Sequence, residues 1–553
     1  MRWHLILAAV VGTGCVPLRG TAAPDVTAMW RKDGLITRLH FVGTGGILAG
    51  AAGTNLSAIA ALPETAALRE QTFQKLAVAP YNFLRDRAAT TNDETALIRP
   101  LLDDLFRTES FLELKDGTND VPEMVFALRL DDDRARLWET NLAAVLVSWC
   151  GLPVTGIQAG GFDGWELRKH HDPNLFQFFR AGNWIVLGWG EDSLQLQPAI
   201  LKRIRKTTRP VDQDTNNWLD AWVDWPALAP HQLAPRSVEL PAMRLQVQGR
   251  KEFVRSELTM KFAAPLGLKL NPWRIPTNII RNPIVSFTAT RGLAPRLNET
   301  AEAKEFNLPP LPDQVYIWAL AGIPQQTQLV APVTDASNYM QQLAPGLVAM
   351  ANAFLSDHSS KDSMTAQSRA FTVAAVHTNG EIEFTGMPPF VIPRLGVFHD
   401  SGSDYLAGGL MPAMKGKQPL PPELISEITR HGNLIGYGWE FTGERLKQWH
   451  GLFSLGQVIL NPVAPDAGAL ADKWIQALWG KLGRSATEVL LTAPDEVTVI
   501  RNSTTGFTAL ELSGLAYWLD SPGFPLSAHR EPPRWRSVPA GLPLAPPGQM
   551  HQP

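Results

Sequence analysis

The stretch Pro122–Lys206 most strongly constrains the fold, because it holds a full succession of strand and helix patterns. It opens with a strand at Glu123–Leu130 and passes through the acidic run Asp131–Asp133 into a helix that reaches about Trp149. Three further strands are expected after it, at Trp165–Arg168, Leu175–Phe179 and Trp184–Trp189. A closing helix follows them and ends in Lys202–Lys206. The stretch therefore predicts a compact unit of sheet and helix, which defines an architecture but no chemistry.

A looser version of this unit is predicted in the second half of the chain. There, a strand at Gln314–Leu320 precedes a helix through Ala336–Leu355, and Thr378–Gly380 has the composition of a tight hairpin turn. These elements indicate a second domain of similar construction.

A match in spacing gives limited support for an internal duplication. Arg134 and Trp138 follow the strand of the first unit, and Arg445 and Trp449 follow a strand at Asn433–Trp439. The match rests on two residue types, so the duplication stays a hypothesis.

The length of 553 residues exceeds what one ordinary core covers, so two domains are expected. We expect an α+β fold with two related domains of mainly antiparallel sheet packed with helices, at residues 24–295 and 313–525. The charged, proline-containing segment 296–312 is expected to link them. The proline-rich residues 526–553 are expected to form a disordered tail.

Three segments carry further local predictions. The alternation of apolar and polar residues over Met243–Gln248 predicts a hairpin strand with one wet face. Helical spacing predicts core-packed tryptophans on a helix at Trp218, Trp222 and Trp225. A final strand is expected at Phe507–Leu512.

The N-terminus has the three-part layout of a secretory signal. Met1–His4 carries a positive charge, Leu5–Val11 is apolar, and small residues fill Gly20–Ala23. Cleavage after Ala22 or Ala23 is expected, which places the mature protein outside the cytoplasm, in the periplasm or secreted. An ordinary buried N-terminal strand or helix is the alternative.

The two cysteines fit export without establishing it. Cys15 suggests a lipid anchor as an alternative signal type, but Gly12 stands where such signals usually carry leucine. Cys150 ends an apolar helix face and is expected to be a buried, inert thiol. No later run reaches the roughly 18 apolar residues of a membrane span, so no transmembrane helix is predicted.

A glycine-rich run, Gly43–Gly50, follows a predicted strand, a position where some cofactor-binding turns occur. The dinucleotide fingerprint needs glycine where Leu48 stands, and no strand-end acid follows at the required distance. The turn of bacterial asparaginases is excluded because Ile47 replaces its second threonine. We therefore expect a flexible loop and no cofactor.

The densest group of ligand-type residues is His170, His171 and Asp172. Neighbouring histidines on a strand point to opposite faces, so they do not readily share one metal ion. A solvated turn is the preferred interpretation, and no metal site is predicted. His170 and His171 stay as candidate binding residues.

No catalytic residue is identified. The segment His399–Asp404 contains the residue types of a catalytic triad, but it lacks the nucleophile elbow and reads as a polar hairpin loop. Asp131–Asp133 is explained as helix capping, and the basic Lys202–Lys206 complements the C-terminus of a helix. Paired carboxylates for glycoside hydrolysis cannot be singled out.

The chain is rich in tryptophan, with 18 residues. Trp184 and Trp189 lie five residues apart on a predicted strand, so they face opposite sides, and one of them is a candidate surface residue for stacking on a sugar. The net charge of −3 gives no basis for a nucleic-acid partner.

Two patterns resemble a class of exported bacterial proteins of verrucomicrobial type whose function is not established. These are Ala181–Trp189 followed by Asp192–Leu194, and Pro276–Phe287 with the strand Pro312–Leu320. The resemblance covers residues 30–520 and implies an extracytoplasmic α+β protein, without implying any catalytic residue.

The sequence thus favours an exported cell-envelope protein that is not an enzyme and binds an unknown ligand or protein partner through a face of its sheets. The alternative is an extracytoplasmic, glycan-directed hydrolase whose acidic residues meet only in the fold. Two converging acids with displaced pKa values would favour the hydrolase, whereas a broad apolar face without them would favour binding.

Overall fold

The computed structural model describes most of the chain, in these ranges: 34–84, 94–117, 122–168, 174–191, 194–210, 216–228, 240–322, 326–358, 372–378, 380–386, 392–410, 418–460 and 469–525. The predicted signal peptide (1–23) and tail (526–553) lie outside the described residues.

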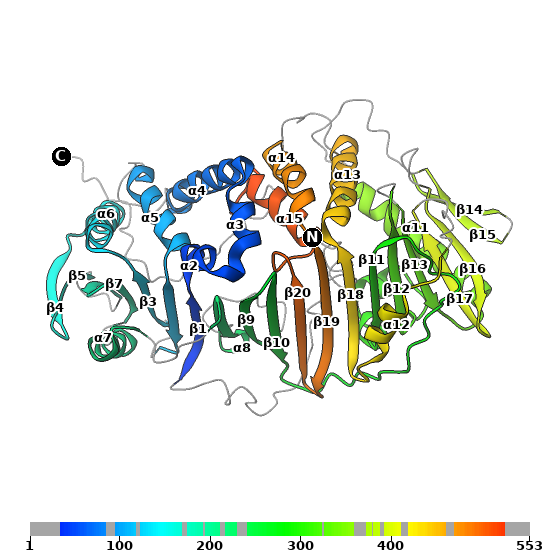
Figure 1. Cartoon of the computed structure of the whole chain (residues 1–553), viewed down its shortest axis with the longest axis horizontal. Helices are drawn as coiled ribbons and strands as arrows, with labels where there is room; N and C mark the ends of the chain where they lie inside the picture. The colour runs from blue at the N-terminus through cyan, green and yellow to red at the C-terminus, as the bar shows by residue number, and fades with distance from the viewer. Residues whose placement is uncertain are drawn as a thin grey trace, which may run out of the picture. The chain divides into compact units, whose positions relative to one another are not determined.

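The described residues divide into two compact units. The first unit comprises residues 34–264 and 515–525, and the second comprises residues 265–514. In each unit, helices pack on a mainly antiparallel sheet, so the predicted α+β class is confirmed (Figure 1). None of the described helices combines the length and the apolar character that crossing a membrane requires.

The first unit has ten described strands, paired antiparallel in the order β10-β9-β8-β1-β2-β3-β7-β6-β5-β4. The strands are β1 (Leu35–Phe41), β2 (Ser110–Lys115), β3 (Glu123–Arg129), β4 (Thr155–Ala159), β5 (Phe162–Arg168), β6 (Leu175–Ala181), β7 (Trp184–Gly190), β8 (Leu219–Asp224), β9 (Ala242–Arg250) and β10 (Phe253–Lys261). The helices are α2 (Gly43–Ala49), η2 (Ala51–Gly53), α3 (Thr54–Ala60), α4 (Pro63–Leu84), α5 (Thr95–Arg107), α6 (Asp132–Cys150), α7 (Leu196–Thr207) and α8 (Trp225–Leu228).

The second unit also has ten described strands, paired antiparallel in the order β20-β19-β18-β11-β12-β13-β17-β16-β15-β14. The strands are β11 (Ile284–Arg291), β12 (Gln314–Leu320), β13 (Thr327–Pro332), β14 (Ala374–Thr378), β15 (Glu381–Thr385), β16 (Arg394–Asp400), β17 (Ser403–Gly409), β18 (Leu434–Phe441), β19 (Arg484–Ala493) and β20 (Glu496–Ser503). The helices are α9 (Ala294–Leu297), α10 (Ala301–Glu305), α11 (Ala336–His358), α12 (Pro422–Thr429), α13 (Thr442–Leu460), α14 (Ala469–Leu478), η3 (Trp479–Lys481) and α15 (Ala509–Asp520), in which the division between the units falls.

The two units share one strand order, with each strand of the second unit numbered ten above its counterpart in the first. A register shift occurs at the same place in both, between Leu35 and Thr37 where β1 pairs with β2, and between Ile284 and Ser286 where β11 pairs with β12. Thr37 and Ser286 therefore occupy equivalent positions, which allows the faces of the two sheets to be compared residue by residue.

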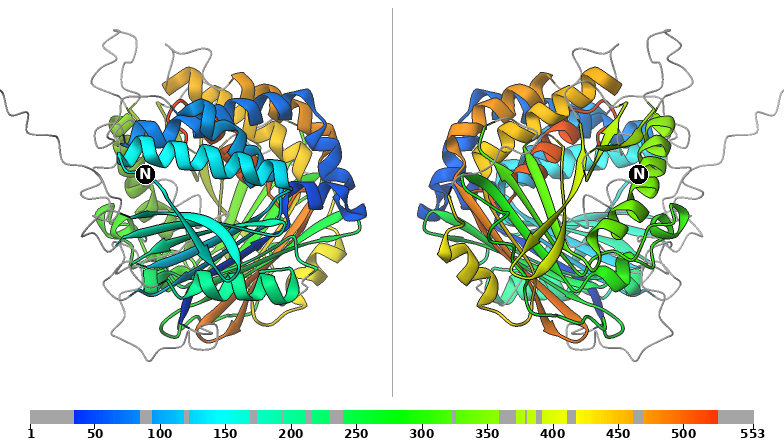
Figure 2. Two further views of the ribbon diagram at one scale, coloured as in Figure 1. Left: turned by 90° about the vertical axis from the view of Figure 1, so that its left-hand side faces the viewer. Right: turned by 90° about the vertical axis from the view of Figure 1, so that its right-hand side faces the viewer.

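Helices cover both faces of the first unit's sheet. Phe179 packs with Ile200 of α7, whereas its neighbour Phe178 packs with Trp138 of α6, because successive strand residues point to opposite faces. The left view of Figure 2 shows α6 on one side of these strands and α7 on the other. At strands β3, β6 and β7, the sheet is thus covered by helices on both faces.

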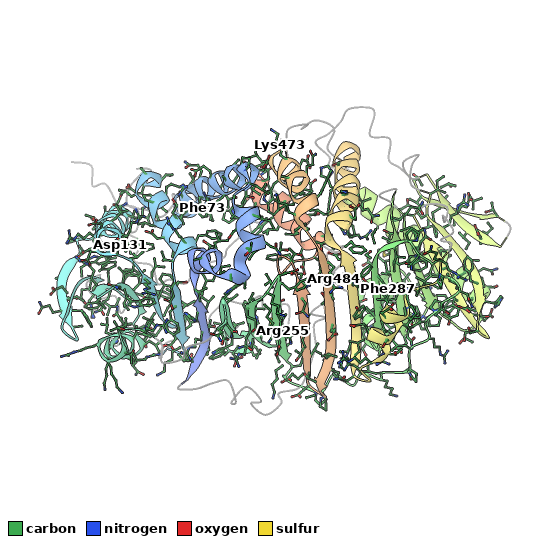
Figure 3. All side chains as sticks on the ribbon, viewed as in Figure 1. Phe73, Asp131, Arg255, Phe287, Lys473 and Arg484 are labelled. Carbon is green, nitrogen blue, oxygen red and sulfur yellow. The ribbon has the colours of Figure 1, made fainter. Side chains whose placement is uncertain are left out.

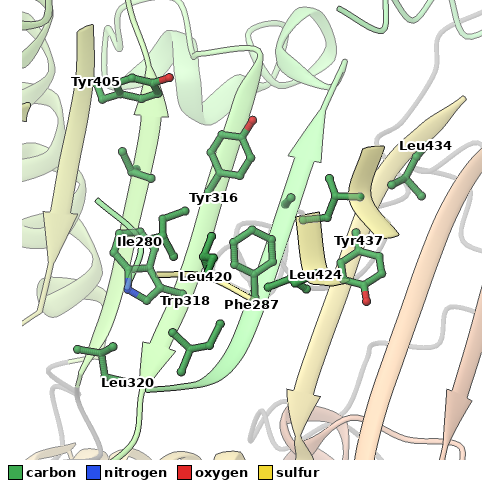
Figure 4. Packing of buried hydrophobic residues seen from close by; sticks show 14 residues of the cluster. Ile280, Phe287, Tyr316, Trp318, Leu320, Tyr405, Leu420, Leu424, Leu434 and Tyr437 are labelled. Atoms are coloured by element: carbon green, nitrogen blue, oxygen red, sulfur yellow. The ribbon is translucent and has the colours of Figure 1, made fainter. Parts of the chain in front are cut away.

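The second unit repeats this layering. Leu406 packs with Met340 of α11, whereas the adjacent Tyr405 belongs to the core that contains Ile428 of α12. Figure 2 shows α11 and α12 on opposite sides of the strands, and Figure 4 shows the core on the α12 side, in which Phe287 and Tyr316 are fully buried.

The start of α6 follows the capping prediction. Asp131, labelled in Figure 3, accepts a hydrogen bond of 2.9 Å from the backbone N–H of Arg134. Gly151 ends the helix in the left-handed region, with φ of 67°. Inside it, Trp138 donates to Asp104 of α5 at 2.9 Å, so this carboxylate ties the two helices together.

The glycine run expected as a loop forms α2 instead. Gly43 turns the chain with φ of 79°, and a Cβ at Gly45 would lie 2.9 Å from the carbonyl oxygen of Arg107. The glycines thus allow a short helix to lie close against α5, and the interpretation as a flexible loop was wrong.

The segment expected as a linker, 296–312, contains the end of α9 and all of α10. It connects β11 with β12, which pair in one sheet, and the units divide after Ala264 instead. Pro295, just before the segment, lies in the first turn of α9, and Pro309, Pro310 and Pro312 precede β12, so these prolines mark a connection within the unit.

Two local predictions were wrong. Leu219–Asp224 is strand β8, and Trp222 therefore projects from a strand; its helical spacing from Trp218 and Trp225 is incidental. Ala509–Asp520 is helix α15, where a strand was expected.

Candidate functional site

An apolar face extends over five neighbouring strands of the first unit. Pairing places three rows of side chains in register across β2, β1, β8, β9 and β10 on the same side. We call these rows the aliphatic face; they are Leu114–Thr37–Val223–Met243–Met260, Leu112–Leu39–Ala221–Leu245–Leu258 and Ser110–Phe41–Leu219–Val247–Ser256.

Most apolar side chains of this face keep partial contact with solvent. Among them, Leu114 and Met260 are buried. The others are half-buried: Leu39, Phe41, Leu112, Leu219, Ala221, Val223, Met243, Leu245, Val247 and Leu258. A contiguous apolar surface that the chain covers only in part is typical of a binding surface for an apolar partner.

Two ends of the face are defined by close contacts. At one end, a Cβ on Gly249 would lie 2.6 Å from the Cβ of Ala52, so this glycine allows η2 to approach β9. At the other end, Leu228 of α8 packs in a cluster with Ile36 and Leu114. The half-buried rows lie between these contacts.

The opposite face of the same strands is charged. The buried carboxylate of Glu113 accepts hydrogen bonds from Arg203 at 2.9 and 3.4 Å, and Arg38 lies 3.7 Å from it. Asp220 accepts from Arg244 at 3.2 Å. Arg255 on β10, labelled in Figure 3, forms part of the same face.

A histidine and a glutamate extend this charged face. His40 lies 2.9 Å from Glu109, and this hydrogen bond is the main cause that holds the pKa of the Glu109 carboxyl below its usual value, against the effect of burial. The alternation of β1, β8 and β9 thus separates an aliphatic side from an ionic side.

The chemistry of the aliphatic face is that of apolar contact. Its rows hold leucine, valine, methionine and alanine side chains and one aromatic ring, Phe41, with hydroxyl groups only at Thr37, Ser110 and Ser256. A sugar would need several hydrogen-bonding groups beside its ring, which these rows do not supply, whereas an aliphatic chain needs none.

Elevated carboxyl pKa values occur at Glu123 and Glu440, in different units. Burial is the main cause at both, opposed by hydrogen bonds from backbone N–H groups, of Leu196 to Glu123 at 2.5 Å and of Ala509 to Glu440 at 2.7 Å. Each carboxylate holds the start of a helix, α7 or α15. These acids therefore have structural roles and do not converge on a common site within either unit.

The structure places the tryptophans named as candidate binding residues on opposite sides of β7. Trp184 is buried in the α7-side cluster and donates to the backbone oxygen of Thr208 at 3.1 Å. Trp189 is half-buried and lies between Met124 and Phe176 in the sheet. Trp184 therefore lies on the side away from the aliphatic face, whereas Trp189 continues, through Met124, the row that contains Leu114 and Thr37.

The two histidines named with them, His170 and His171, lie outside the described residues. Among the residues that the structure describes, no group of three or more histidine, cysteine, aspartate or glutamate side chains could hold a metal ion.

The triad-like segment forms a hairpin between β16 and β17. Ser401 and Gly402 make the turn, both with positive φ, and exposed His399 lies 2.5 Å from Asp404. Cys150 is buried, and burial raises the pKa of its thiol, as expected for an inert cysteine.

The sequence predicts three strands of the aliphatic face, β1 and the hairpin pair β9 and β10, but not how far the face extends. The alternation of β9 and β10 predicts their hairpin, but β8 was interpreted as helix because its tryptophan spacing outweighed the alternation of Leu219, Ala221 and Val223 with polar or aromatic neighbours. That alternation was the available signal. The pairing of five strands into rows was not readable from the sequence, because it depends on register.

Comparisons with known proteins leave the function open. No family model matches the sequence, and no curated protein matches it significantly. A solved structure titled "Structure of crystal form IV of TP0453" is similar over 41% of this chain and 77% of that chain, with 11% sequence identity and a TM-score of 0.21. A similarity at this level carries no argument, so function must be argued from the residues.

Proposed function

We propose that this is an exported binding protein without catalytic activity, and that its first unit binds an aliphatic ligand, such as an acyl chain, on the aliphatic face. The observation that carries the proposal is the set of half-buried leucine, valine and methionine side chains in register across five strands. Covering them would remove apolar area from water at about 25 cal/mol per Å².

The hydrolase alternative lacks comparable support. The carboxyl groups with raised pKa values, Glu123 and Glu440, each accept hydrogen bonds from the first turn of a helix. A general acid needs a raised pKa in a position that reaches substrate, and these groups are committed to backbone amides.

A fluorescent fatty acid tests the proposal directly. We expect cis-parinaric acid to gain fluorescence on binding the protein, and unlabelled oleate to displace it. Exchange of the cross-strand neighbours Leu245 and Leu258 for glutamine should weaken binding at least about tenfold, since each loses apolar contact worth about 1 kcal/mol.

The matched control changes the other face of the same strands. Gln246 and Glu257 are also cross-strand neighbours, one position along from the test pair, and they point to the ionic side. The variant Gln246→Ser/Glu257→Gln should bind like the unchanged protein. Equal loss in both variants, or no fluorescence gain at all, contradicts the proposal.

Export is tested separately. Cell fractionation should place the protein outside the cytoplasm, and mass spectrometry should find a mature N-terminus after Ala22 or Ala23. An intact N-terminus in the cytoplasmic fraction would overturn this part of the proposal and leave the ligand proposal standing.

We further propose that the two units arose by duplication. The support is the common order of ten strands and the register shift at Thr37 and at Ser286. The arginine–tryptophan pairs do not contribute, because Arg134 follows β3, whereas Arg445 follows β18, whose counterpart is β8. A related protein that consists of a single unit with the same strand order would support the duplication. Related two-unit proteins in which only one unit keeps this strand order would argue against the duplication.

A further inference from the structure

Helix α7 presents a fixed cationic surface to solvent. One side of the helix is buried against the sheet through Leu196, Ile200, Leu201 and Ile204. The other side carries Lys202, Arg205 and Lys206, all exposed. Because the buried side anchors the helix, these cations are held on an outward surface.

Among the described residues, the three cations have no acidic partner. Helix α7 contains no aspartate or glutamate, and none of these side chains forms an ion pair with a described residue. Glu113 is buried beneath the helix and is paired with Arg203. The positive charge of the surface is therefore not neutralised within the part of the unit that the structure describes.

The equivalent helix of the second unit shows that the fold does not require this charge. Helix α12 also follows the seventh strand of its unit and packs on the same side of its sheet, yet its exposed residues include Glu423 and Glu427. The helix dipole favours cations in the last turn of α7, but Lys202 lies earlier in the helix. Local structure thus accounts for only part of the charge.

We propose that the exposed side of α7 docks on a bilayer surface that contains anionic lipid. Lys202 and Lys206 lie one helical turn apart, about 6 Å, so the three cations can meet several headgroup phosphates at once. Nucleic acid fits less well, because α7 offers no aromatic side chain for stacking and the chain carries a net charge of −3.

Vesicle sedimentation with the full chain tests this docking. We expect binding to vesicles of phosphatidylcholine with about one third phosphatidylglycerol, weak binding to pure phosphatidylcholine, and loss of binding when salt rises from about 0.05 to 0.5 M. Lys202→Gln/Arg205→Gln/Lys206→Gln should lower the affinity about a hundredfold, at about 1 kcal/mol for each cation near the surface.

A control variant removes the same charge elsewhere. Arg430→Gln/Lys473→Gln/Lys481→Gln also deletes three exposed cations and should bind vesicles as the unchanged protein does. Circular dichroism and thermal unfolding should match for both variants, because the replaced side chains are exposed. Equal binding to both vesicle types, equal loss in both variants, or salt-sensitive binding to duplex DNA without vesicle binding overturns the proposal.

This docking is independent of the aliphatic ligand. The α7 variant should still bind cis-parinaric acid, and the variant with Leu245 and Leu258 replaced should still sediment with anionic vesicles. Failure of one assay with success of the other therefore identifies which proposal is wrong.

Discussion

The two units arrange the same strands in the same order, but at the first strand of each unit, β1 or β11, they reverse which face carries the apolar residues. At equivalent positions of β1 and β11, Arg38 of the first unit corresponds to Phe287 of the second, and Leu39 corresponds to Thr288. Phe287 is fully buried in the core on the α12 side, whereas Arg38 belongs to the ionic face. Strand order alone therefore does not decide where a core forms.

The difference follows from the helices after the eighth strand of each unit. In the second unit, β18 leads into the long helices α13 and α14. The equivalent rows there are mainly small or polar in the first two, Ala319–Ser286–Glu440–Ser485–Ser503 and Ile317–Thr288–Gly438–Thr487–Arg501, and the third, Val315–Thr290–Gly436–Val489–Val499, holds three valines. In the first unit, β8 leads into the four-residue helix α8, and the equivalent rows are aliphatic. The second unit packs α13 on this face, whereas in the first unit most apolar side chains of the equivalent rows stay half-buried.

The largest expected contrast is between Phe287→Ala and Arg38→Ala. Loss of the fully buried ring should cost about 3–5 kcal/mol of unfolding free energy through lost apolar contact and a cavity. Arg38 is partly exposed and 3.7 Å from Glu113, so its removal should cost about 1 kcal/mol or less. Urea unfolding of both variants measures this.

Similar costs for these two substitutions would contradict the reversal of the faces. A reduced urea dependence in either variant would show a changed unfolding transition, and the comparison should then be repeated with Phe287→Leu.

The buried polar group of the second unit should show the next largest effect. Arg445 donates to Thr327 at 3.2 Å and to Gln448 at 2.6 Å, and burial lowers the pKa of its guanidinium to about 10, against the nearby charge of Glu440. Arg445→Met should cost about 3 kcal/mol, because it leaves buried polar groups without their partner. A loss below about 1 kcal/mol in urea unfolding would show that this network contributes little.

How far the sequence predicts the structure differs between local and distant features. Patterns within one element were readable: the strand Glu123–Arg129, the cap at Asp131 and the hairpin around Gly380 all follow from neighbouring residues. Pairing between distant elements was not readable. The equivalence of Arg134 and Arg445 failed for this reason, since it matched residues by spacing without knowledge of strand order.

The candidate site was harder to predict for the same physical reason. Its rows combine residues from β2 to β10, and no single segment shows that Leu39 and Leu245 belong to one row. The individual alternations indicate a wet and a dry side of each strand, but register decides which dry sides adjoin and burial decides whether they are covered.

In both units, one buried glutamate should make the free energy of unfolding depend on pH. Burial raises the pKa of Glu123 and Glu440 above the usual 4.5, so the folded state binds more protons than the unfolded state between 4.5 and the raised value. The stability that this protonation supplies is full below 4.5 and is lost as pH rises through the raised pKa. Glu123→Gln and Glu440→Gln should each flatten the decline, as measured by urea unfolding over a pH series.

Glutamine retains an oxygen that can accept the hydrogen bond from the backbone N–H of Leu196 or Ala509. The first turns of α7 and α15 should therefore keep this hydrogen bond. Glu123→Ala and Glu440→Ala are the matched controls, and they should destabilise at every pH because those amides lose their acceptor. A decline of unchanged steepness in both glutamine variants would assign the pH dependence to other groups.

The smallest expected effect is also the most decisive for the aliphatic face. Leu245→Thr gives the first unit the residue that the second unit carries at the equivalent place, Thr487. Because Leu245 is half-buried, the substitution should lower the unfolding free energy by about 1 kcal/mol or less when no ligand is present. A cost of about 2–5 kcal/mol, typical of a leucine truncated inside a closed core, would mean that the first unit's own helices already cover this face. The face would then be part of the core, and the site for an aliphatic ligand would have to lie elsewhere.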